Sequence, residues 1–233
     1  MTMIGYEQRR GQLEVYFDRT AVQAWTALTS DAPVGRIRAT VRAGRERMRT
    51  TLLGYLPDDL SGQRVLDAGC GTGVLASCLA RRGAQVVAVD ISPTLVGLGR
   101  ERTLHEPSGG SIEFYVGDML EPRLGSFDWV VAQDSLIHYS GEQLLTLVSQ
   151  LCARTRRGMV FSFAPRTPLL TLMHVVGKLF PRGNRSPDIR PIAERSLRRR
   201  LAAHPEMQGF AALRSERIKS GFYTSQTMEL VRQ

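Results

Sequence analysis

The sequence predicts an α/β protein built on a doubly wound, mainly parallel sheet. Two observations lead to this prediction: short apolar runs alternate with helical segments over most of the chain, and a glycine-rich turn follows the first of these runs. Strands that alternate with helices are typical of βαβ units, in which a crossover helix returns the chain to the same sheet. At 233 residues and 42% hydrophobic content, the chain is long enough to bury a full core of this kind.

The regular alternation covers the middle of the chain. The expected strands are Arg64–Ala68, Gln85–Ile91, Ile112–Val116, Trp129–Ala132 and Met159–Phe163. The expected helices between them are Val74–Arg82, Pro93–Arg102 and Gly141–Thr155. Because each strand is short and almost wholly apolar, we expect the strands to be covered by helices on both faces of the sheet.

The region before the first strand is expected to form an N-terminal helical arm or cap, residues 1–60, ahead of a main domain at residues 61–233. Its pattern is helical from about Gly11 to Leu56. An apolar face is expected to be formed by Ile37, Val41, Met48, Leu52 and Leu56, with arginines on the other faces.

The end of the chain departs from the βαβ rhythm. Ile192–Ala203 is predicted to be a basic helix, and Phe210–Lys219 and Gly221–Val231 to be two strands of a tight hairpin around Ser220 and Gly221. Parallel strands followed by a terminal hairpin match the seven-stranded, Rossmann-like sheet of class I methyltransferases.

The glycine-rich turn carries the most specific signal. It follows the first strand as Asp67-Ala68-Gly69-Cys70-Gly71-Thr72-Gly73, so that a ligand can approach the backbone of Gly69, Cys70 and Gly71 at the carboxyl edge of the sheet. A dinucleotide fold would have G-x-G-x-x-G, but here the third glycine comes one residue early. Asp67 would repel a pyrophosphate and attract the ammonium of a methionine group. The turn therefore predicts S-adenosylmethionine as the ligand.

Polar and apolar side chains at the ends of the next strands complete the predicted cofactor site. Asp90 is placed to accept hydrogen bonds from the ribose hydroxyls, and Ile91 to lie against the adenine ring. The remaining candidates follow the third and fourth strands: Gly117, Asp118 (for the adenine amine), Met119 (for the ring), Gln133 and Asp134. A single carboxylate of this kind is often an ordinary loop residue; their joint order along one sheet edge favours a site.

Composition limits the other function classes. No stretch reaches the roughly 18 apolar residues that a membrane span needs, and the start of the sequence lacks the apolar run of a signal peptide, so a cytoplasmic protein is expected. The cysteines and histidines lack metal-ligand spacing, which predicts no protein-bound metal. The net charge of +9 is almost wholly arginine; an acidic partner is compatible with it, but a solvated surface explains the charge equally well.

Several longer segments are similar to one enzyme family. These segments are Glu14–Thr20 (EVYFDRT) with Trp25, Val34–Arg45 (VGRIRATVRAGR), Asp134–Tyr139 (DSLIHY), Phe163–Pro168 (FAPRTP) and Gly221–Ser225 (GFYTS). Over nearly its whole length the chain resembles the magnesium-protoporphyrin O-methyltransferases of chlorophyll and bacteriochlorophyll synthesis. The resemblance implies methyl transfer from S-adenosylmethionine to a propionate of magnesium-protoporphyrin IX, with the magnesium carried by the substrate.

The implied chemistry needs little from the protein beyond placement. A propionate has a pKa near that of Glu, about 4.3, so it is ionised at neutral pH and needs no strong general base. His138 and Tyr16 are the candidate catalytic residues that would hold this carboxylate by hydrogen bonds. Taken alone, His138 would be read as a structural histidine and Tyr16 as a core aromatic residue; the resemblance favours the functional interpretation.

Residues 165–190 and the arginines that follow are less specific. The segment 165–190 has one apolar helical face; it is either a helix packed on the sheet or a substrate-covering insertion that meets the porphyrin or a membrane surface. Arg195, Arg198, Arg199 and Arg200 form either a solvated face or a contact for anionic lipid or for the large, porphyrin-binding subunit of magnesium chelatase. Weak, salt-sensitive membrane association is predicted.

Other functions remain as alternatives. The nearest is a methyltransferase for another small acid or a quinone. Nucleic-acid modification is not favoured, because the arginines are spread over several segments and no RNA-binding module is recognisable. A cofactor-binding scaffold without catalysis is opposed by the intact Asp67, Asp90 and Asp118, and a dehydrogenase by the glycine spacing.

Overall fold

A computed structural model describes residues 3–20, 35–104, 109–166 and 189–233. The helices are α1 (Met3–Val15), α3 (Arg36–Leu53), α4 (Val74–Arg81), α5 (Pro93–Thr103), α6 (Gly141–Ala153) and α8 (Glu194–Ala202). The strands are β1 (Arg64–Ala68), β2 (Gln85–Asp90), β3 (Ser111–Val116), β4 (Phe127–Ala132), β5 (Thr155–Phe163), β6 (Phe210–Ala212), β7 (Arg217–Ser220) and β8 (Tyr223–Arg232). Single turns are the π-helical η1 (Tyr16–Thr20) and the 3₁₀ segments η2 (Pro122–Leu124), η3 (Leu136–His138) and η4 (Pro205–Met207).

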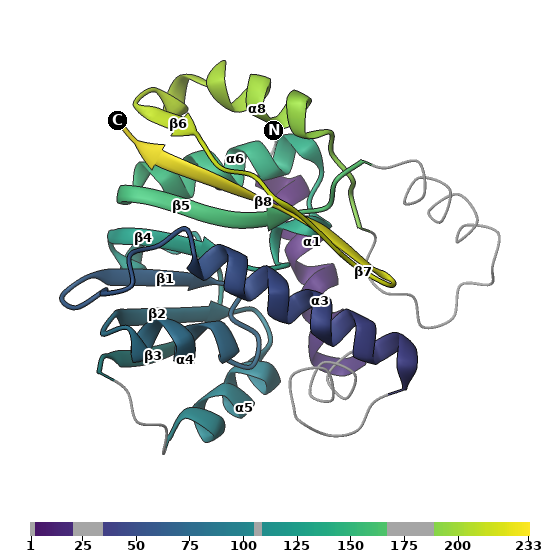
Figure 1. Ribbon diagram of the computed structural model, residues 1–233, viewed down its shortest axis with the longest axis vertical. Coiled ribbons are helices and arrows are strands. Elements are labelled where there is room, and N and C mark those ends of the chain that lie inside the picture. The colour runs from purple at the N-terminus through teal and green to yellow at the C-terminus, as the bar shows by residue number, and fades with distance from the viewer. Residues whose placement is uncertain (1–2, 21–34, 105–108, 167–188) are drawn as a thin grey trace.

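These strands form one mixed sheet with β1 near its centre (Figure 1). The order is β3-β2-β1-β4-β5-β8-β6, and the first five of these strands are parallel to one another. All five strands predicted from apolar runs are present, and the predicted doubly wound, mainly parallel sheet is confirmed. The chain order reverses between β1 and β4, so the carboxyl ends of these two strands flank the point where doubly wound sheets bind ligands.

The C-terminal hairpin differs from the prediction in one respect. Phe210–Lys219 is not a single strand: β6 and β7 both pair antiparallel with β8, β6 with its end and β7 with its beginning. Between them, backbone hydrogen bonds from Leu213 to Glu229 and from Thr227 to Glu216 keep the chain against β8. The edge position expected for one strand is therefore occupied by an interrupted strand, which makes the sheet eight-stranded.

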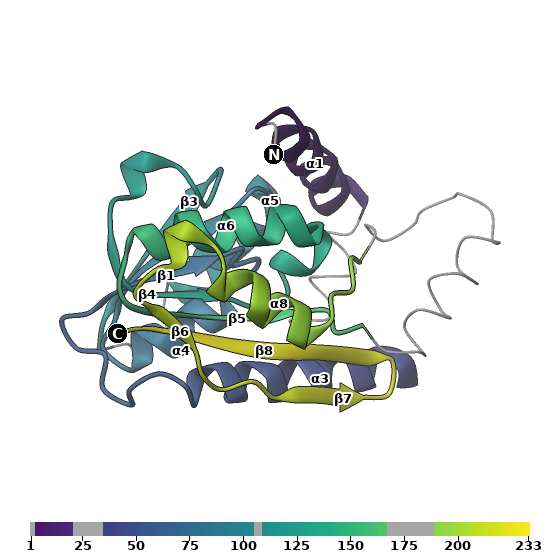
Figure 2. The same ribbon diagram turned by 90° about the horizontal axis from the view of Figure 1, so that it is seen from above.

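Helices cover both faces of the sheet, as its apolar strands require. Figure 2 shows α3 and α4 on one side and α1, α6 and α8 on the other. Side chains alternate between the faces: Leu66 packs in the core under α6 and α8, whereas Val65 packs in the core under α3 and α4. Two helices begin at polar caps, since Ser92 accepts from the amide of Leu95 and Ser140 forms a capping box with Gln143.

The N-terminal arm is helical, as predicted, but its boundaries differ. The first helix begins at Met3 rather than near Gly11, and α3 buries Met48 and Leu52 but leaves Ile37 58% exposed. The predicted apolar face is therefore wrong at Ile37, because the start of α3 extends beyond the sheet (Figure 1). The division into 1–60 and 61–233 stays a prediction, and most of the predicted insertion at 165–190 lies outside the described residues.

No helix within the described ranges is long and apolar enough to cross a membrane.

Candidate functional site

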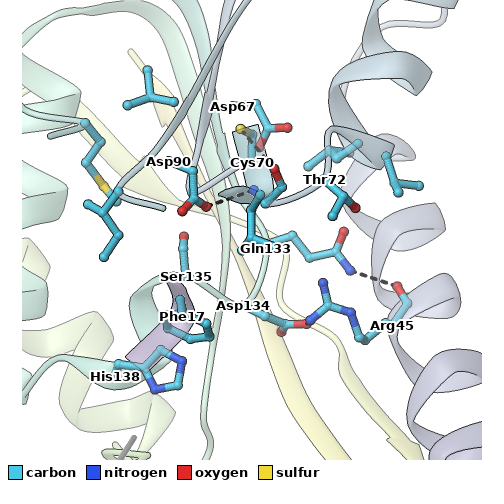
Figure 3. A pocket seen from close by; sticks show the side chains of 18 of the residues that line it. Phe17, Arg45, Asp67, Cys70, Thr72, Asp90, Gln133, Asp134, Ser135 and His138 are labelled. Carbon is cyan, nitrogen blue, oxygen red and sulfur yellow. Dashed lines mark hydrogen bonds and ion pairs between the residues drawn. The ribbon is translucent and has the colours of Figure 1, made fainter. Parts of the chain in front are cut away.

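A cavity opens at the carboxyl edge of the sheet, over β1, β2 and β4 and against α3 and η1. Among the residues that line it are these sequence-predicted ones: Asp67, Gly69, Cys70, Gly71, Asp90, Ile91, Gly117, Met119, Gln133 and His138. They come from segments far apart in the sequence, and the parallel sheet brings them together because its strands all end at this edge (Figure 3).

The β1–α4 turn has the tight geometry that its glycines predict. Gly69 has a φ of +86°, and a Cβ at this position would lie 2.3 Å from Cβ of Ser135. The amides of Gly69 and Cys70 both donate to the carbonyl oxygen of Val89, at 2.8 and 2.9 Å. Any larger residue at position 69 would push the turn away from β4, so glycine is needed for both conformation and space.

Asp67 is the most deeply buried carboxylate of the cavity. Its side chain is 1% exposed, and within the described part of the chain Oδ2 meets no hydrogen-bond donor. Burial, and then the nearby Asp90, raise the pKa of Asp67 to about 7. A buried acceptor without a donor is costly unless a ligand supplies one. A ligand ammonium is the group that would satisfy both the hydrogen bond and the charge.

Asp90 is held in place by backbone amides on either side. Its Oδ2 accepts from Gly71 N at 2.8 Å and its Oδ1 from Ser92 N at 2.9 Å. Burial raises its pKa above the usual range. A carboxylate oxygen can accept more than one hydrogen bond, so both oxygens keep capacity for hydroxyl groups of a ligand.

The predicted adenine-binding residues are divided between the cavity and the N-terminal arm. Gly117 and Met119 line the cavity. Asp118 instead accepts from Tyr6 Oη at 2.7 Å and pairs with Arg10 at 2.7 Å, both on α1. The hydrogen bond from an adenine amine to Asp118 stays a prediction. The structure adds a role that the sequence did not indicate, because these two contacts of Asp118 hold α1 against the edge of the sheet.

His138 lies at the opposite end of the cavity from Asp67 (Figure 3). It is buried, and its imidazole packs edge-on against Phe17 with ring centroids 5.4 Å apart. Phe17 of η1 lines the cavity, whereas Tyr16 packs against Phe17 at 5.2 Å and is not among the described lining residues. Sequence reasoning thus chose the right turn, η1, but missed Phe17, although it stands in the same YFDRT segment.

The wall opposite His138 is cationic, which composition alone did not indicate. Arg42, Arg45 and Arg49 of α3 line the cavity. Arg45 forms an ion pair with Asp134 at 3.1 Å, and its carbonyl oxygen accepts from Gln133 Nε2 at 2.9 Å. The i, i+3 and i, i+4 spacing of these arginines puts them on one helix face. Because that face meets the sheet edge, part of the net charge belongs to the site rather than to the solvated surface.

The site thus has carboxylates at one end, arginines along one wall and aromatic rings at the far end. Such a cavity suits a ligand with both an amine and an acidic group, and an acceptor that is an anion. Among the described residues, no group of His, Cys, Asp or Glu side chains is arranged to hold a metal ion. Burial raises the pKa of the Cys70 thiol well above its usual value, so this lining thiol is neutral.

Comparisons with known proteins give consistent results. Residues 132–232 match the family described as magnesium-protoporphyrin IX methyltransferase C-terminus, and residues 65–158 match a methyltransferase domain. The chain is 47% identical to the magnesium-protoporphyrin O-methyltransferase of Rhodobacter capsulatus over 225 residues, which covers 96% of this chain and 97% of that protein. It is 31% identical to the protein of the same name from Synechocystis sp. (strain PCC 6803), covering 93% and 94% of the two chains.

A solved structure shares the fold over the same length. The crystal structure of magnesium protoporphyrin IX methyltransferase from Synechocystis PCC 6803 with bound S-adenosylhomocysteine superposes with a TM-score of 0.83 at 30% identity. The similarity covers 96% of this chain and 99% of that one.

Proposed function

The chain belongs to the magnesium-protoporphyrin O-methyltransferase family, and from this membership we propose how each wall of the cavity serves the reaction. The enzyme transfers a methyl group from S-adenosylmethionine to magnesium-protoporphyrin IX, a step of chlorophyll and bacteriochlorophyll synthesis. The observation that carries this function is the 47% identity over 96% of the chain, which favours the porphyrin over a small acid or a quinone as the acceptor.

The acidic end of the cavity is proposed to hold the methyl donor, whose sulfonium supplies an electrophilic methyl group. Asp67 would bind the ammonium of the methionine moiety, since its buried Oδ2 meets no donor among the described residues. Asp90 would accept from the ribose hydroxyls. Ile91 and Met119 would pack on the adenine, and the open backbone at Gly71 leaves room for the chain of the ligand.

The aromatic end of the cavity is proposed to place the acceptor propionate. This group is ionised near neutral pH, so the protein contributes orientation rather than proton abstraction. Positioning alone can lower a barrier by roughly 7–11 kcal/mol. His138 would donate one hydrogen bond to the carboxylate, and Tyr16 would donate another from the arm. Phe17 supports this arrangement because its ring packs against the imidazole of His138.

Mass spectrometry of the porphyrin tests the function directly. Incubation with S-adenosylmethionine and magnesium-protoporphyrin should add one methyl group to the porphyrin, as a carboxylic ester. Replacing the donor with S-adenosylhomocysteine, or the acceptor with its dimethyl ester, should remove the product. A porphyrin that gains no methyl group from the native enzyme would contradict the proposed function.

We also propose that the exposed part of α8 contacts an acidic partner. Arg198 and Arg200 are engaged within the fold, by Glu194 and Glu142 respectively, whereas Arg195 and Arg199 are exposed. This pair is proposed to contribute to weak, peripheral binding to anionic lipid, or to docking of the large subunit of magnesium chelatase.

Two binding assays separate these partners. In a flotation assay with vesicles that contain anionic lipid, the enzyme should co-migrate with the vesicles at low salt. At high salt it should separate from them, because salt screens the attraction between exposed charges. Co-sedimentation with the chelatase subunit in the absence of lipid tests the other partner. The double variant Arg195→Ser/Arg199→Ser should weaken binding to whichever of the two partners, lipid or chelatase subunit, the native enzyme binds. Binding that is unaltered in both assays would refute the role of α8.

A further inference from the structure

The carboxylate of Asp18 joins the π-helical turn η1 to the start of α5. Its Oδ1 accepts one hydrogen bond from Ser92 Oγ at 3.1 Å and another from the amide of Thr94 at 3.3 Å. These bonds connect residues that lie 74 and 76 positions apart in the sequence. The turn that carries Tyr16 and Phe17 is therefore fastened to the helix that follows β2.

The start of α5 offers donors that the helix itself cannot use. The first amides of a helix have no carbonyl partner within it. Ser92 is the N-cap residue and accepts from the amide of Leu95, while the hydrogen of its hydroxyl group is donated to Asp18. The N-terminus of a helix also attracts a carboxylate through its dipole. Hydrogen bonds and charge therefore hold the side chain of Asp18 in the same place.

The same loop also fixes the carboxylate that is proposed to bind the ribose. The amide of Ser92 donates to Asp90 Oδ1 at 2.9 Å, and its hydroxyl group donates to Asp18. Ser92 is fully buried, so solvent does not compete for either bond. One residue thus contacts the acidic end of the cavity through its backbone and η1 through its side chain.

The two residues before Asp18 belong to the aromatic end of the cavity. Phe17 lines the cavity and packs against the imidazole of His138, next to which it lies in Figure 3. Tyr16 packs in turn on the ring of Phe17. Because both aromatic residues directly precede Asp18, an anchor at Asp18 restricts how far they can shift along the cavity. A π-helical turn is rare, and such turns occur frequently at functional sites.

The turn that carries His138, η3, has anchors of its own. Arg9 Nε on α1 donates to the carbonyl oxygen of His138 at 3.0 Å, and the amide of Arg190 donates to the carbonyl oxygen of Ile137 at 2.9 Å. These bonds act on η3 and not on η1. The placement of η1 relative to the acidic end therefore needs a separate contact, and Asp18 supplies one.

We propose that Asp18 is a positioning residue for methyl transfer: it holds η1 in register with the loop 90–92, so that Tyr16 and Phe17 meet the acceptor propionate while Asp90 holds the donor. The inference rests on the proposed function, which assigns the donor to Asp90 and the propionate to Tyr16. A carboxylate oxygen must approach the sulfonium methyl in line, so the two ends of the cavity have to be fixed relative to each other. Asp18 is not among the described lining residues, and it acts through the residues that it holds.

Steady-state kinetics of Asp18→Ala test this role. The variant lacks both hydrogen bonds, and turnover should fall by about 10- to 100-fold, the range expected when a reacting group is misplaced by roughly 1 Å. kcat and kcat/KM for magnesium-protoporphyrin should fall together, because the lost interaction matters in the transition state rather than in binding. Calorimetry should show an affinity for S-adenosylhomocysteine near that of wild type, since Asp67 and Asp90 are unchanged, and this binding also shows that the variant is folded.

A conservative variant separates positioning from other effects of the substitution. Asp18→Asn keeps an oxygen that can accept from Ser92 and Thr94, so it should recover most of the turnover that Asp18→Ala loses. Asp58→Ala is the matched control, because it removes an aspartate whose side chain is fully exposed, and it should behave as wild type.

Three results would overturn the inference. The first is a turnover of Asp18→Ala equal to that of Asp58→Ala. The second is a loss of S-adenosylhomocysteine affinity in proportion to the loss of turnover, because Asp18 would then act on donor binding. The third is an Asp18→Asn variant as slow as Asp18→Ala. A native enzyme that methylates no porphyrin would instead reject the proposed function.

Discussion

At the scale of single residues, Asp67 and Asp90 set the charge of the acidic end of the cavity. Burial raises the pKa of both, and that of Asp67 reaches about 7. A carboxyl group with this pKa is protonated in a large fraction of molecules near neutral pH. A cationic ligand favours its ionised form, so donor affinity should fall as the pH is lowered through 7.

The raised pKa also has a consequence for stability. Asp67 ionises near pH 3.9 in the unfolded chain but near 7 in the folded one, so over this window the folded state holds the extra proton and stability falls as the pH rises. Asp67→Asn removes this loss. Without ligand, the variant should therefore melt roughly 8–16 °C above wild type at pH 8, since a shift of about three pKa units is worth about 4 kcal/mol and 1 kcal/mol corresponds to roughly 2–4 °C in a chain of this size.

The difference in melting temperature between Asp67→Asn and wild type should shrink as the pH is lowered from 7 toward 4. Thermal melting followed by circular dichroism at several pH values measures this difference. A variant that is less stable than wild type at pH 8 would show that Asp67 contributes to folding rather than to binding alone.

His138 is the residue proposed to place the acceptor carboxylate. His138→Ala should lower turnover by about 100-fold, the cost expected from a small misplacement of the reacting group, and leave donor affinity near that of wild type. His204→Ala, which replaces a histidine outside the cavity, is the control. Steady-state rates and calorimetry give the two quantities, and unchanged turnover would remove His138 from the mechanism.

At the scale of elements, α3 connects the cavity to the C-terminal strand β8. Its buried half packs Met48 and Leu52 against the sheet, and its bare position at Gly44 rests on the ring of Tyr223. Helix α3 therefore forms part of the wall of the site. Helix α1 reaches the same edge differently, through Asp118 and through a hydrogen bond from Arg9 to the carbonyl oxygen of His138 at 3.0 Å.

A pair of glycine substitutions tests the packing of α3. An alanine at Gly44 would clash with the ring of Tyr223. Overpacking of this kind costs about 1–3 kcal/mol of stability. We therefore expect Gly44→Ala to lower the melting temperature and to impair ligand binding. Gly97 is also helical, on α5, but a Cβ there meets no atom within 4 Å. Gly97→Ala should stabilise the protein by up to about 1 kcal/mol. Equal effects of the two substitutions in denaturant titrations would contradict this packing.

At the scale of the whole molecule, local sequence patterns could predict the sheet but not all of its edge. The strands β1 to β5 are apolar runs between turn residues, and apolar periodicity is a property of neighbouring residues, so they could be found without a structure. The break between β6 and β7 could not, because it depends on pairing with β8 along its whole length.

The same distinction applies to the cavity. Asp67 and Asp90 could be predicted because each lies at the carboxyl end of a strand, and parallel strands end at a common edge. Other contacts join residues that lie 89 to 112 positions apart in the sequence: Asp134 with Arg45 and Tyr223, and Asp118 with Tyr6. No local periodicity encodes such contacts. The family resemblance indicated the segments that contain these residues, but not which atoms meet.

Calorimetric titration of S-adenosylhomocysteine into the native enzyme and into Asp67→Asn tests the central claim, that a buried carboxylate beside the glycine-rich turn binds the methyl donor. We expect saturable binding to the native enzyme at pH 8 and a loss of at least about tenfold in affinity in the variant, as for a hydrogen-bonded ion pair. Equal affinity in the two proteins, or no heat of binding in either, would contradict the claim.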